Sequence, residues 1–432
     1  MPSVSAEWPS KDWYHGFASP ELDSLIASAI SNNFDLAAAR ARVAQADARA
    51  RQAGAAILPK LDANGNATLF TGGTGGAHAH ETDWSAALSA SYEVDFWGKN
   101  RAVRDSARAL AESSRAETAT VKMTVLNGIA STYFQMLSLR ERIALSQLSL
   151  DEARKLLEFI DVRFKAGRVT ASELAAQRAA VANAELVIPQ LRQQELQAID
   201  ALALLVGEAP EGFKVSADSL LPLQELAITP GLPSELLLRR PDVYSAEKSL
   251  TAANADLIAA RAALFPSVDL TLTGGVQNPA VQAALITLAG TGYSLNVGAA
   301  IAQTIFDAGR RRGVIAQAQG RQDELVATYR NAILAALVDV ENALGQIQHL
   351  NEQQQAQADN IAQSERAFEG AQVRYEQGSG PFVAVLEAQR VLYAAREQAG
   401  LYKLSRLQAL LSLCKALGGG WQNPTADLAY RP

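Results

Sequence analysis

Two histidines and a glutamate stand close together in the segment His78-Ala79-His80-Glu81, and these side-chain types can bind a divalent metal ion. The segment belongs to a glycine-rich stretch, residues 71–83, which we expect to be a loop. A loop of this kind gives the two imidazoles no preformed geometry, so we predict no metal site. The neighbouring run Gly72-Gly73-Thr74-Gly75-Gly76 lacks the lysine and the following helix of a phosphate-binding loop. We interpret the whole stretch as a flexible outer loop.

No other set of side chains has a spacing that supports catalysis. The sequence contains no recognisable serine–histidine–acid set and no cluster of metal ligands, so it predicts neither an enzyme nor a bound cofactor. The formal net charge of −6 gives no reason to expect nucleic-acid binding. Arg310-Arg311-Arg312 opens a predicted helix, and we interpret it as interfacial rather than as a ligand site. Cys414 is the only cysteine and stands in an apolar run, which is typical of a buried thiol.

The largest element that the sequence predicts is a helix from Lys99 to Lys165. Between Gly98 and Gly167 there is no proline and one glycine. A seven-residue apolar repeat favours a left-handed coiled coil, and at 1.5 Å per residue this helix would be about 100 Å long. The repeat consists of Ile129, Met136, Ile143, Leu150, Leu157 and Phe164.

The same pattern occurs again 211 positions later. This offset relates Gly167 to Gly378 and Gly207 to Gly418, and a constant offset through a helix and its breakers indicates a duplicated chain. We expect a returning helix after each long one, with a kink or break at Pro189. The second repeat consists of Val340, Ile347, Gln354, Ile361, Phe368 and Tyr375.

Each half also contains two segments in which apolar and polar residues alternate, as in half-buried β-strands. We predict strands at about 61–69, 84–96, 268–273 and 293–304, and the second is long enough to cross a bilayer when tilted. Four strands are too few to close a barrel, and a bilayer does not tolerate open sheet edges. A membrane protein would therefore need several chains to share one barrel, whereas the alternative is a soluble structural coiled coil that tethers other molecules. The apolar face of the second strand contains Trp84, Leu88, Tyr92, Val94 and Phe96.

Three motifs resemble a known family. The stretch Leu232-Pro233-Ser234-Glu235-Leu236-Leu237-Leu238-Arg239-Arg240-Pro241-Asp242-Val243, continued by Ala260 to Pro266, is similar to TolC-like outer-membrane efflux proteins of the OprM and NodT type. The segments Tyr92 to Gly98 and Ile305 to Arg310 resemble signatures of the same family. The resemblance extends from about Trp13 to Trp421.

The resemblance implies a mainly helical chain that forms a homotrimer in the outer membrane of a Gram-negative bacterium. Each chain would give four strands to a twelve-strand β-barrel, and its helices would form a long antiparallel α-barrel that crosses the periplasm. Such a protein is the passive exit duct of a tripartite pump for drugs or other small molecules. Its partners would be outer-membrane lipid, a periplasmic membrane-fusion adaptor and an inner-membrane transporter, most often of the RND type. Many members of this branch carry a lipidated amino-terminal cysteine, and none stands near Met1.

The resemblance also divides the chain into three kinds of segment. Residues 20–58, 98–206, 234–265 and 308–417 would form the periplasmic helices, and residues 59–97 and 266–307 the barrel strands and outer loops. Residues 1–19, 207–233 and 418–432 would form an irregular belt around the helices.

The resemblance also implies that the periplasmic gate lies at the two hairpin tips. Tyr375 matches a tyrosine that helps to hold the tunnel closed, and we expect its hydroxyl to bridge neighbouring helices; the alternative is an ordinary coiled-coil residue. Glu173 and Glu387 match acidic positions at the closed end, although both could be plain surface carboxylates. The chain departs from the family at Ala384, where relatives often have an aspartate. The other predicted tip residues are Arg163, Gly167, Arg374 and Gly378.

Overall fold

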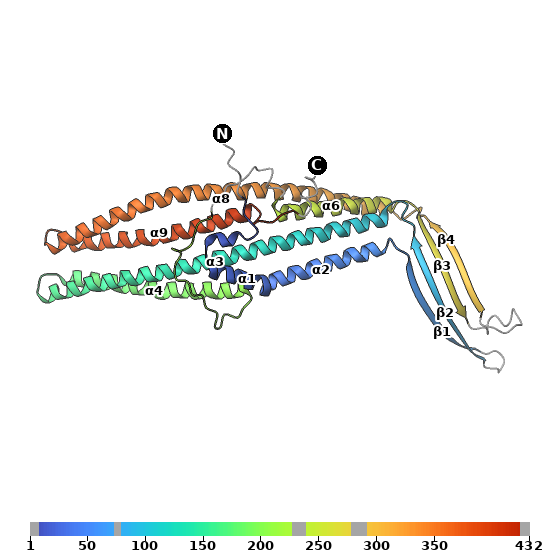
Figure 1. The fold of residues 1–432 in the computed structure, drawn as a ribbon, viewed down its shortest axis with the longest axis horizontal. Coiled ribbons are helices and arrows are strands. Elements are labelled where there is room, and N and C mark those ends of the chain that lie inside the picture. Colours follow the sequence, from blue (N-terminus) through green and yellow to red (C-terminus); the bar gives the residue numbers. More distant parts are fainter. Residues whose placement is uncertain (1–7, 73–78, 227–238, 278–291, 424–432) are drawn as a thin grey trace, which may run out of the picture. The chain divides into compact units, whose positions relative to one another are not determined.

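A computed structural model describes residues 8–72, 79–226, 239–277 and 292–423. The described chain consists of helices and one four-stranded sheet (Figure 1). It divides into two compact units, and each half of the chain contributes to both. The first unit comprises residues 1–40, 117–244 and 332–432, and the second comprises residues 41–116 and 245–331.

Two helices of 67 residues each dominate the chain, α3 (Lys99–Lys165) and α8 (Arg310–Glu376). At 1.5 Å per residue each is about 100 Å long. The predicted seven-residue repeat of α3 is largely buried, because Ile129, Met136 and Leu150 are at most 4% exposed. The repeat ends before Phe164, whose side chain is 38% exposed.

In the first unit each long helix continues into a returning helix. The helix α4 (Ala171–Val206) runs back along α3, and α9 (Phe382–Ala416) runs back along α8 (Figure 1). The turns contain Gly167 and Gly378, whose φ angles of 71° and 74° favour glycine. Corresponding amides close both turns, from Arg168 to the Arg163 carbonyl and from Ser379 to the Arg374 carbonyl.

The duplication is visible in the backbone. Three pairs of glycines 211 residues apart all have positive φ angles. These pairs mark the start of each long helix, the hairpin turn and the end of each returning helix, so the two halves repeat their breakers as well as their helices. They are Gly98 with Gly309, Gly167 with Gly378, and Gly207 with Gly418.

The start of α4 is fixed by a capping box. The Thr170 hydroxyl accepts a hydrogen bond from the Glu173 amide, and the Glu173 carboxylate accepts one from the Thr170 amide. The helix then continues through Pro189 to Val206, so the break that was one of the two outcomes expected there does not occur. Packing of Ile188 and Leu191, which are both buried, stabilises the helix on either side of the proline.

The main core of the first unit lies where a short 3₁₀ helix (Trp13–Phe17) and α1 (Pro20–Asn32) pack on α3. Phe17 packs edge to face on Phe134 with 4.9 Å between ring centroids. A break separates α1 from α2 (Phe34–Ala55), because the Asn33 side chain accepts a hydrogen bond from the Leu36 amide and donates one to the Leu205 carbonyl.

The second unit contains the sheet, together with α6 (Pro241–Ala262) from Ser245 onward and the adjoining parts of α2, α3 and α8. The strands are β1 (Lys60–Gly72), β2 (Ala79–Glu93), β3 (Ser267–Gln277) and β4 (Gly292–Ala302). All neighbours are antiparallel in the order β1-β2-β3-β4 (Figure 1). The loop expected at 71–83 is therefore shorter than predicted, since both strands extend into it and pair Gly72 with Ala79.

The end of β2 also differs from the prediction. The strand ends at Glu93, so Val94 and Phe96 follow it instead of belonging to it. The reason is local, because the Asp95 carboxylate turns to accept hydrogen bonds from the amides of Asn100 and Arg101 at the start of α3. Among the described residues, no helix is long and apolar enough to cross a membrane.

Candidate functional site

One face of the sheet is apolar across all four strands. Directly opposite residues share a face, and the register places Ala63, Leu88, Gly274 and Leu295 in one row. The next row is Leu61, Ala90, Leu272 and Val297. These side chains are not covered within the protomer, since Leu88 is 56% exposed and Val297 is 80% exposed. A continuous apolar surface of this kind indicates contact with another apolar phase or chain.

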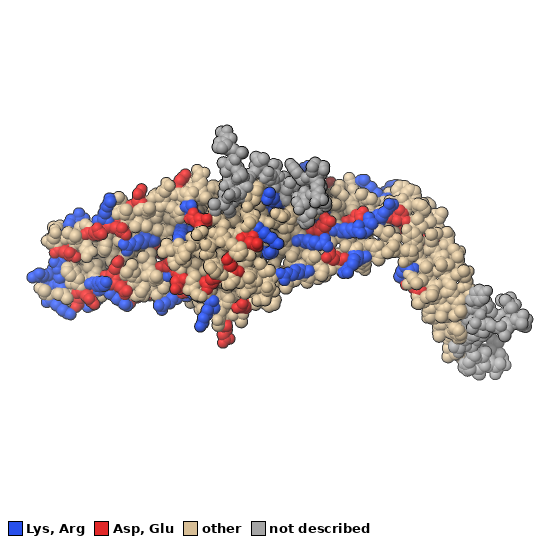
Figure 2. All heavy atoms as spheres, viewed as in Figure 1, with Lys and Arg blue, Asp and Glu red and all other residues tan. Residues whose placement is uncertain are grey.

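The opposite face of the sheet is polar. It carries a row of Asp62, Ser89, Thr273 and Asn296, and the Asn64 amide donates a hydrogen bond of 3.1 Å to the Ser89 hydroxyl. Over the face drawn in Figure 2, charged side chains are frequent on the helices and sparse on the strands. Where the side chains are described, the charged strand residues all lie at the end of the sheet next to the helices: Lys60, Asp62, Glu93 and Asp269.

Both edges of the sheet are open within the protomer. In the described part of the chain β1 pairs only with β2, and β4 pairs only with β3. Each edge strand therefore presents main-chain amides and carbonyls that can pair with another strand.

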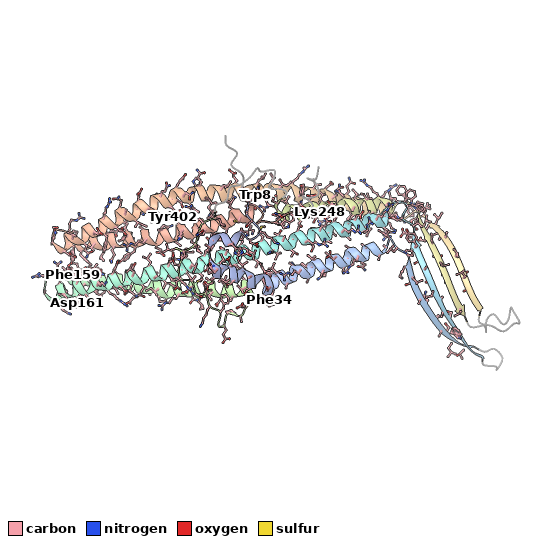
Figure 3. The ribbon with its side chains drawn as sticks, in the orientation of Figure 1. Trp8, Phe34, Phe159, Asp161, Lys248 and Tyr402 are labelled. Atoms are coloured by element: carbon pink, nitrogen blue, oxygen red, sulfur yellow. The ribbon has the colours of Figure 1, made fainter. Side chains whose placement is uncertain are left out.

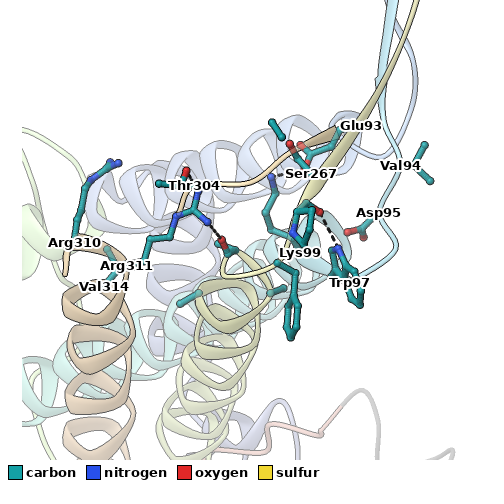
Figure 4. Close-up of a pocket in the computed structure, with 16 residues that line it drawn as sticks. Glu93, Val94, Asp95, Trp97, Lys99, Ser267, Thr304, Arg310, Arg311 and Val314 are labelled. Carbon is teal, nitrogen blue, oxygen red and sulfur yellow. Dashed lines mark hydrogen bonds and ion pairs between the residues drawn. The ribbon is translucent and has the colours of Figure 1, made fainter. Parts of the chain in front are cut away.

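Strand ends and helix starts meet around a cavity of about 350 Å³ (Figure 4). Trp97 stacks on Phe265 with 4.6 Å between ring centroids, and its indole donates a hydrogen bond of 2.8 Å to the Pro266 carbonyl. Lys99 pairs with Glu93, while Arg311 donates to the Thr304 hydroxyl and the Ala263 carbonyl. These contacts fasten the sheet to its helices and pair the opposite charges of Lys99 and Glu93.

At the hairpin tips a small apolar cluster joins the two hairpins. Tyr375 of α8 is only 6% exposed. The centroid of its ring lies 5.1 Å from that of Phe382 and 6.4 Å from that of Phe159. Figure 3 labels Phe159 near the tip of α3. The rest of the cluster comes from both hairpins and consists of Ile160, Leu174, Ala371 and Val385.

The hydrogen bond expected from Tyr375 is not found in the described part of the protomer. Its buried hydroxyl has no partner among the described residues, so its contribution comes from the ring. Burial raises the pKa of this hydroxyl, the Glu173 carboxylate raises it further, and Arg163 opposes both. The guanidinium of Arg163 lies 5.3 Å from the ring centroid and donates to the main-chain oxygens of Tyr375 and Glu376.

The other predicted tip residues have more local roles. Glu173 caps α4, as described above. Glu387 is exposed and pairs with Arg390 at 2.6 Å, and this hydrogen bond lowers the pKa of its carboxyl group. The Arg374 side chain is exposed and only its carbonyl holds the turn. The structure thus brings Arg163, Tyr375 and Glu173 together and leaves Glu387 and Arg374 at the surface.

The sequence reasoning missed a second connection between the hairpins. The Tyr393 hydroxyl of α9 donates to the Glu152 carboxylate of α3 at 2.6 Å and receives a hydrogen bond from Gln389. Burial and the Glu152 carboxylate raise the pKa of Tyr393. Nearby, Arg142 of α3 pairs with Glu397 of α9 at 2.6 Å. In the sequence, Gln389 and Tyr393 are two polar residues four positions apart on an apolar helix face, and this spacing could have indicated the contact.

The described residues contain no group of three or more potential metal ligands. His78 lies outside the described residues, as do the side chains of His80 and Glu81, so the predicted absence of a metal site there stays a prediction. Cys414 is fully buried, and burial raises the pKa of its thiol to about 12. It is therefore a packing residue, as predicted.

Comparison with known proteins decides the family. The sequence model described as "Outer membrane efflux protein" matches residues 25–208 and 232–419, which is most of the chain. The chain belongs to the outer membrane efflux protein family. It is 42% identical to the pyoverdine export outer membrane protein OpmQ of Pseudomonas aeruginosa, over 98% of this chain and 90% of that protein. It is 30% identical to the cation efflux system protein CusC of Escherichia coli K12, over 97% and 91%.

Solved structures of similar proteins support the same family assignment. A crystal structure of CusC superposes with a TM-score of 0.85 at 28% identity and covers 94% of both chains. The outer membrane protein VceC of Vibrio cholerae gives a TM-score of 0.87 at 26% identity, over 96% of this chain and all of that one. The predicted fold class and family are confirmed. The protein is an outer-membrane exit duct for efflux that extends into the periplasm, and this favours the duct over the soluble tether.

Proposed function

We propose that three copies of this chain assemble into one duct whose barrel contains twelve strands. Support comes from the two open edges, because β4 of one protomer can pair with β1 of the next until the ring closes. A bilayer requires this closure, since unpaired main-chain groups are not tolerated in its core. Strands of 11 to 15 residues are long enough to cross the hydrocarbon when tilted.

In this assembly the apolar face of the sheet contacts lipid and the polar face lines the lumen. Trp84, Leu88 and Tyr92 would face the acyl chains, since they share the face of exposed leucines and valines. Val94 and Phe96, beyond the end of β2, would mark the periplasmic boundary of the membrane. Trp97 beside them is 50% exposed, and tryptophan is favoured at that level because its ring is apolar and its indole N–H is polar.

We also propose that the duct works with a periplasmic membrane-fusion adaptor and an inner-membrane transporter of the RND type, and that cargo passes through it unchanged. The related proteins are named for unlike cargo: pyoverdine, cations and toluene. One architecture serving such different molecules supports a generic duct wall, with selection made by the transporter. Pyoverdine-type siderophores are the first cargo to test, because that relative has 42% identity.

The gate of this duct would lie at the hairpin tips. Gly167 and Gly378 make the reversals, and the cluster around Tyr375 with Arg163 holds the two hairpins of one protomer together. Opening would separate the hairpins, so these contacts and the Tyr393–Glu152 bond would bias the tip toward its closed state.

The observation that carries the proposed assembly is a sheet with one apolar face and two open edges. Native mass spectrometry of the detergent-solubilised protein tests it. We expect a species of three times the 46.0 kDa chain mass. A monomer that keeps its secondary structure would contradict the shared barrel.

A further inference from the structure

The helices next to the sheet carry a large excess of positive charge. Segments 41–58, 99–116, 245–262 and 310–331 together contain fifteen lysines and arginines and seven acidic residues. The chain as a whole has a net charge of −6. Figure 2 shows blue side chains on the helices beside the strands, with red ones between them. A positive zone inside an acidic protein points to an anionic partner at this level.

Within this zone a groove of about 490 Å³ lies between α2 and α3. It is lined by Asp47, Ala50, Arg51, Gly54 and Arg108. Asp47 is already neutralised, because Arg115 pairs with it. Neither Arg51 nor Arg108 makes a hydrogen bond or ion pair with another described residue. The groove thus offers two guanidinium groups without a protein anion.

The floor of the groove is open because its residues are small. A Cβ atom placed on Gly54 would have its nearest neighbour at 3.9 Å, the Cγ of Arg104. Arg104 itself is paired with Asp105. A ligand with a compact anionic head could therefore enter between the two arginines without displacing a buried side chain.

The groove lies close to the apolar sheet along the chain. Arg108 is nine residues after the start of α3, which is about 14 Å at 1.5 Å per residue. Helical side chains lean toward the helix N-terminus, so Arg108 leans toward the strands. Between them stands the exposed Trp97, a residue type that favours the headgroup level of a bilayer, together with the exposed rings of Phe96 and Phe265. The polar layer on each side of the hydrocarbon is about 5–8 Å thick, which the guanidinium can reach.

We propose that this groove binds the phosphate headgroup of an anionic phospholipid in the periplasmic leaflet, with Arg51 and Arg108 as its ligands. The inference rests on the proposed contact between the apolar sheet face and lipid. A guanidinium group can donate two parallel hydrogen bonds to the oxygens of one phosphate, and basic pockets beside membrane segments are suited to anionic headgroups. Continuity with the apolar face favours a lipid over an exported anion.

The test is lipid retention by the solubilised full-length protein. The wild type and the double variant Arg51→Gln/Arg108→Gln are mixed with phosphatidylglycerol or with phosphatidylcholine, and bound lipids are measured by native mass spectrometry. We expect the double variant to bind phosphatidylglycerol roughly 10- to 30-fold more weakly, with phosphatidylcholine unchanged. The matched control, Arg168→Gln/Arg192→Gln on and before α4, removes the same charge and should leave both lipids unaffected. Gly54→Leu should block the groove without changing any charge and should also lower phosphatidylglycerol retention.

Unchanged phosphatidylglycerol retention in the double variant would overturn the proposal. So would an altered ion selectivity of the pore in planar bilayers with lipid retention intact, because the groove would then face the lumen. Wild-type insertion into bilayers is recorded in the same experiment. A protein that inserts and conducts but shows no lipid preference refutes only the lipid site, whereas a protein that does not insert refutes the proposed lipid-contacting barrel.

Discussion

Arg163 near the end of α3 reaches across to α8, where it donates to the main-chain oxygen of Tyr375 and lies 5.3 Å from the centroid of that ring. The contact joins the tip of the first hairpin to the tip of the second. A cation near the C-terminal carbonyls of a helix is favourable, and so is a cation over an aromatic face. One side chain thus links the two halves of the duplicated chain where the proposed gate must open.

Tyr375 should act through its ring and not through its hydroxyl. Tyr375→Phe removes a buried hydroxyl that has no partner among the described residues, so we expect little change in tip stability. Tyr375→Ala empties a buried site and should cost roughly 3–5 kcal/mol of local stability. Amide exchange of the tip helices and vancomycin sensitivity of cells making the protein measure the effect. A phenylalanine variant as leaky as the alanine variant would show that the hydroxyl bonds elsewhere in the assembly.

Tyr393 should stabilise the contact between α9 and α3. Tyr393→Phe leaves the Glu152 carboxylate without its donor at 2.6 Å, and hydrogen bonds to charged groups contribute about 1.5–3 kcal/mol. We expect faster amide exchange in α9 on both sides of position 393. Tyr402→Phe is the matched control, because Tyr402 also lies on α9 (Figure 3) and its hydroxyl has no hydrogen bond among the described residues. Equal rates of amide exchange in the two variants would show that the Tyr393–Glu152 hydrogen bond does not stabilise α9.

The two faces of β2 should respond differently to charge. Leu88→Arg places a cation on the apolar face and should cost roughly 2–4 kcal/mol near the bilayer midplane. Ser89→Arg, one residue later, places it on the polar face and should cost much less. Folding yield into liposomes distinguishes the variants. Similar yields would mean that the apolar face does not contact lipid.

Acid should loosen the segment after α4. Burial alone would raise the pKa of Glu21, but hydrogen bonds from the amides of Ser216 and Ala217 outweigh it and lower the pKa. Because the pKa of Glu21 is lower in the folded than in the unfolded chain, its ionised carboxylate stabilises the folded state at pH values above the unfolded-state pKa, near 4.3. This stabilisation is lost as pH falls through the folded-state pKa. The protection of the amides of residues 213–226, measured relative to the intrinsic exchange rate at each pH, should therefore fall in acid for the wild type and depend less on pH in Glu21→Gln, which lacks the titrating group.

Features set by local chemistry were predictable from the sequence. The seven-residue repeat, the 211-residue offset and the alternating strands each depend on neighbours in the chain, and the structure contains all three. The extent of β2 was not predictable from alternation, because the Asp95 cap ends the strand before Val94. The Tyr393–Glu152 contact was not predictable either, since it depends on the register between two helices that lie more than 200 residues apart in sequence.

The most direct test of a closed exit duct is single-channel conductance in planar bilayers. The wild type should insert and conduct poorly, because the hairpin tips hold it shut. Arg163→Ala combined with Tyr375→Ala removes the link and the ring between the hairpins and should raise the conductance several-fold, while Arg390→Ala with Glu387→Ala, an exposed pair on α9, should not. A wild-type conductance that neither pair changes would contradict a gate at the tips, and a protein that never conducts would contradict the duct itself.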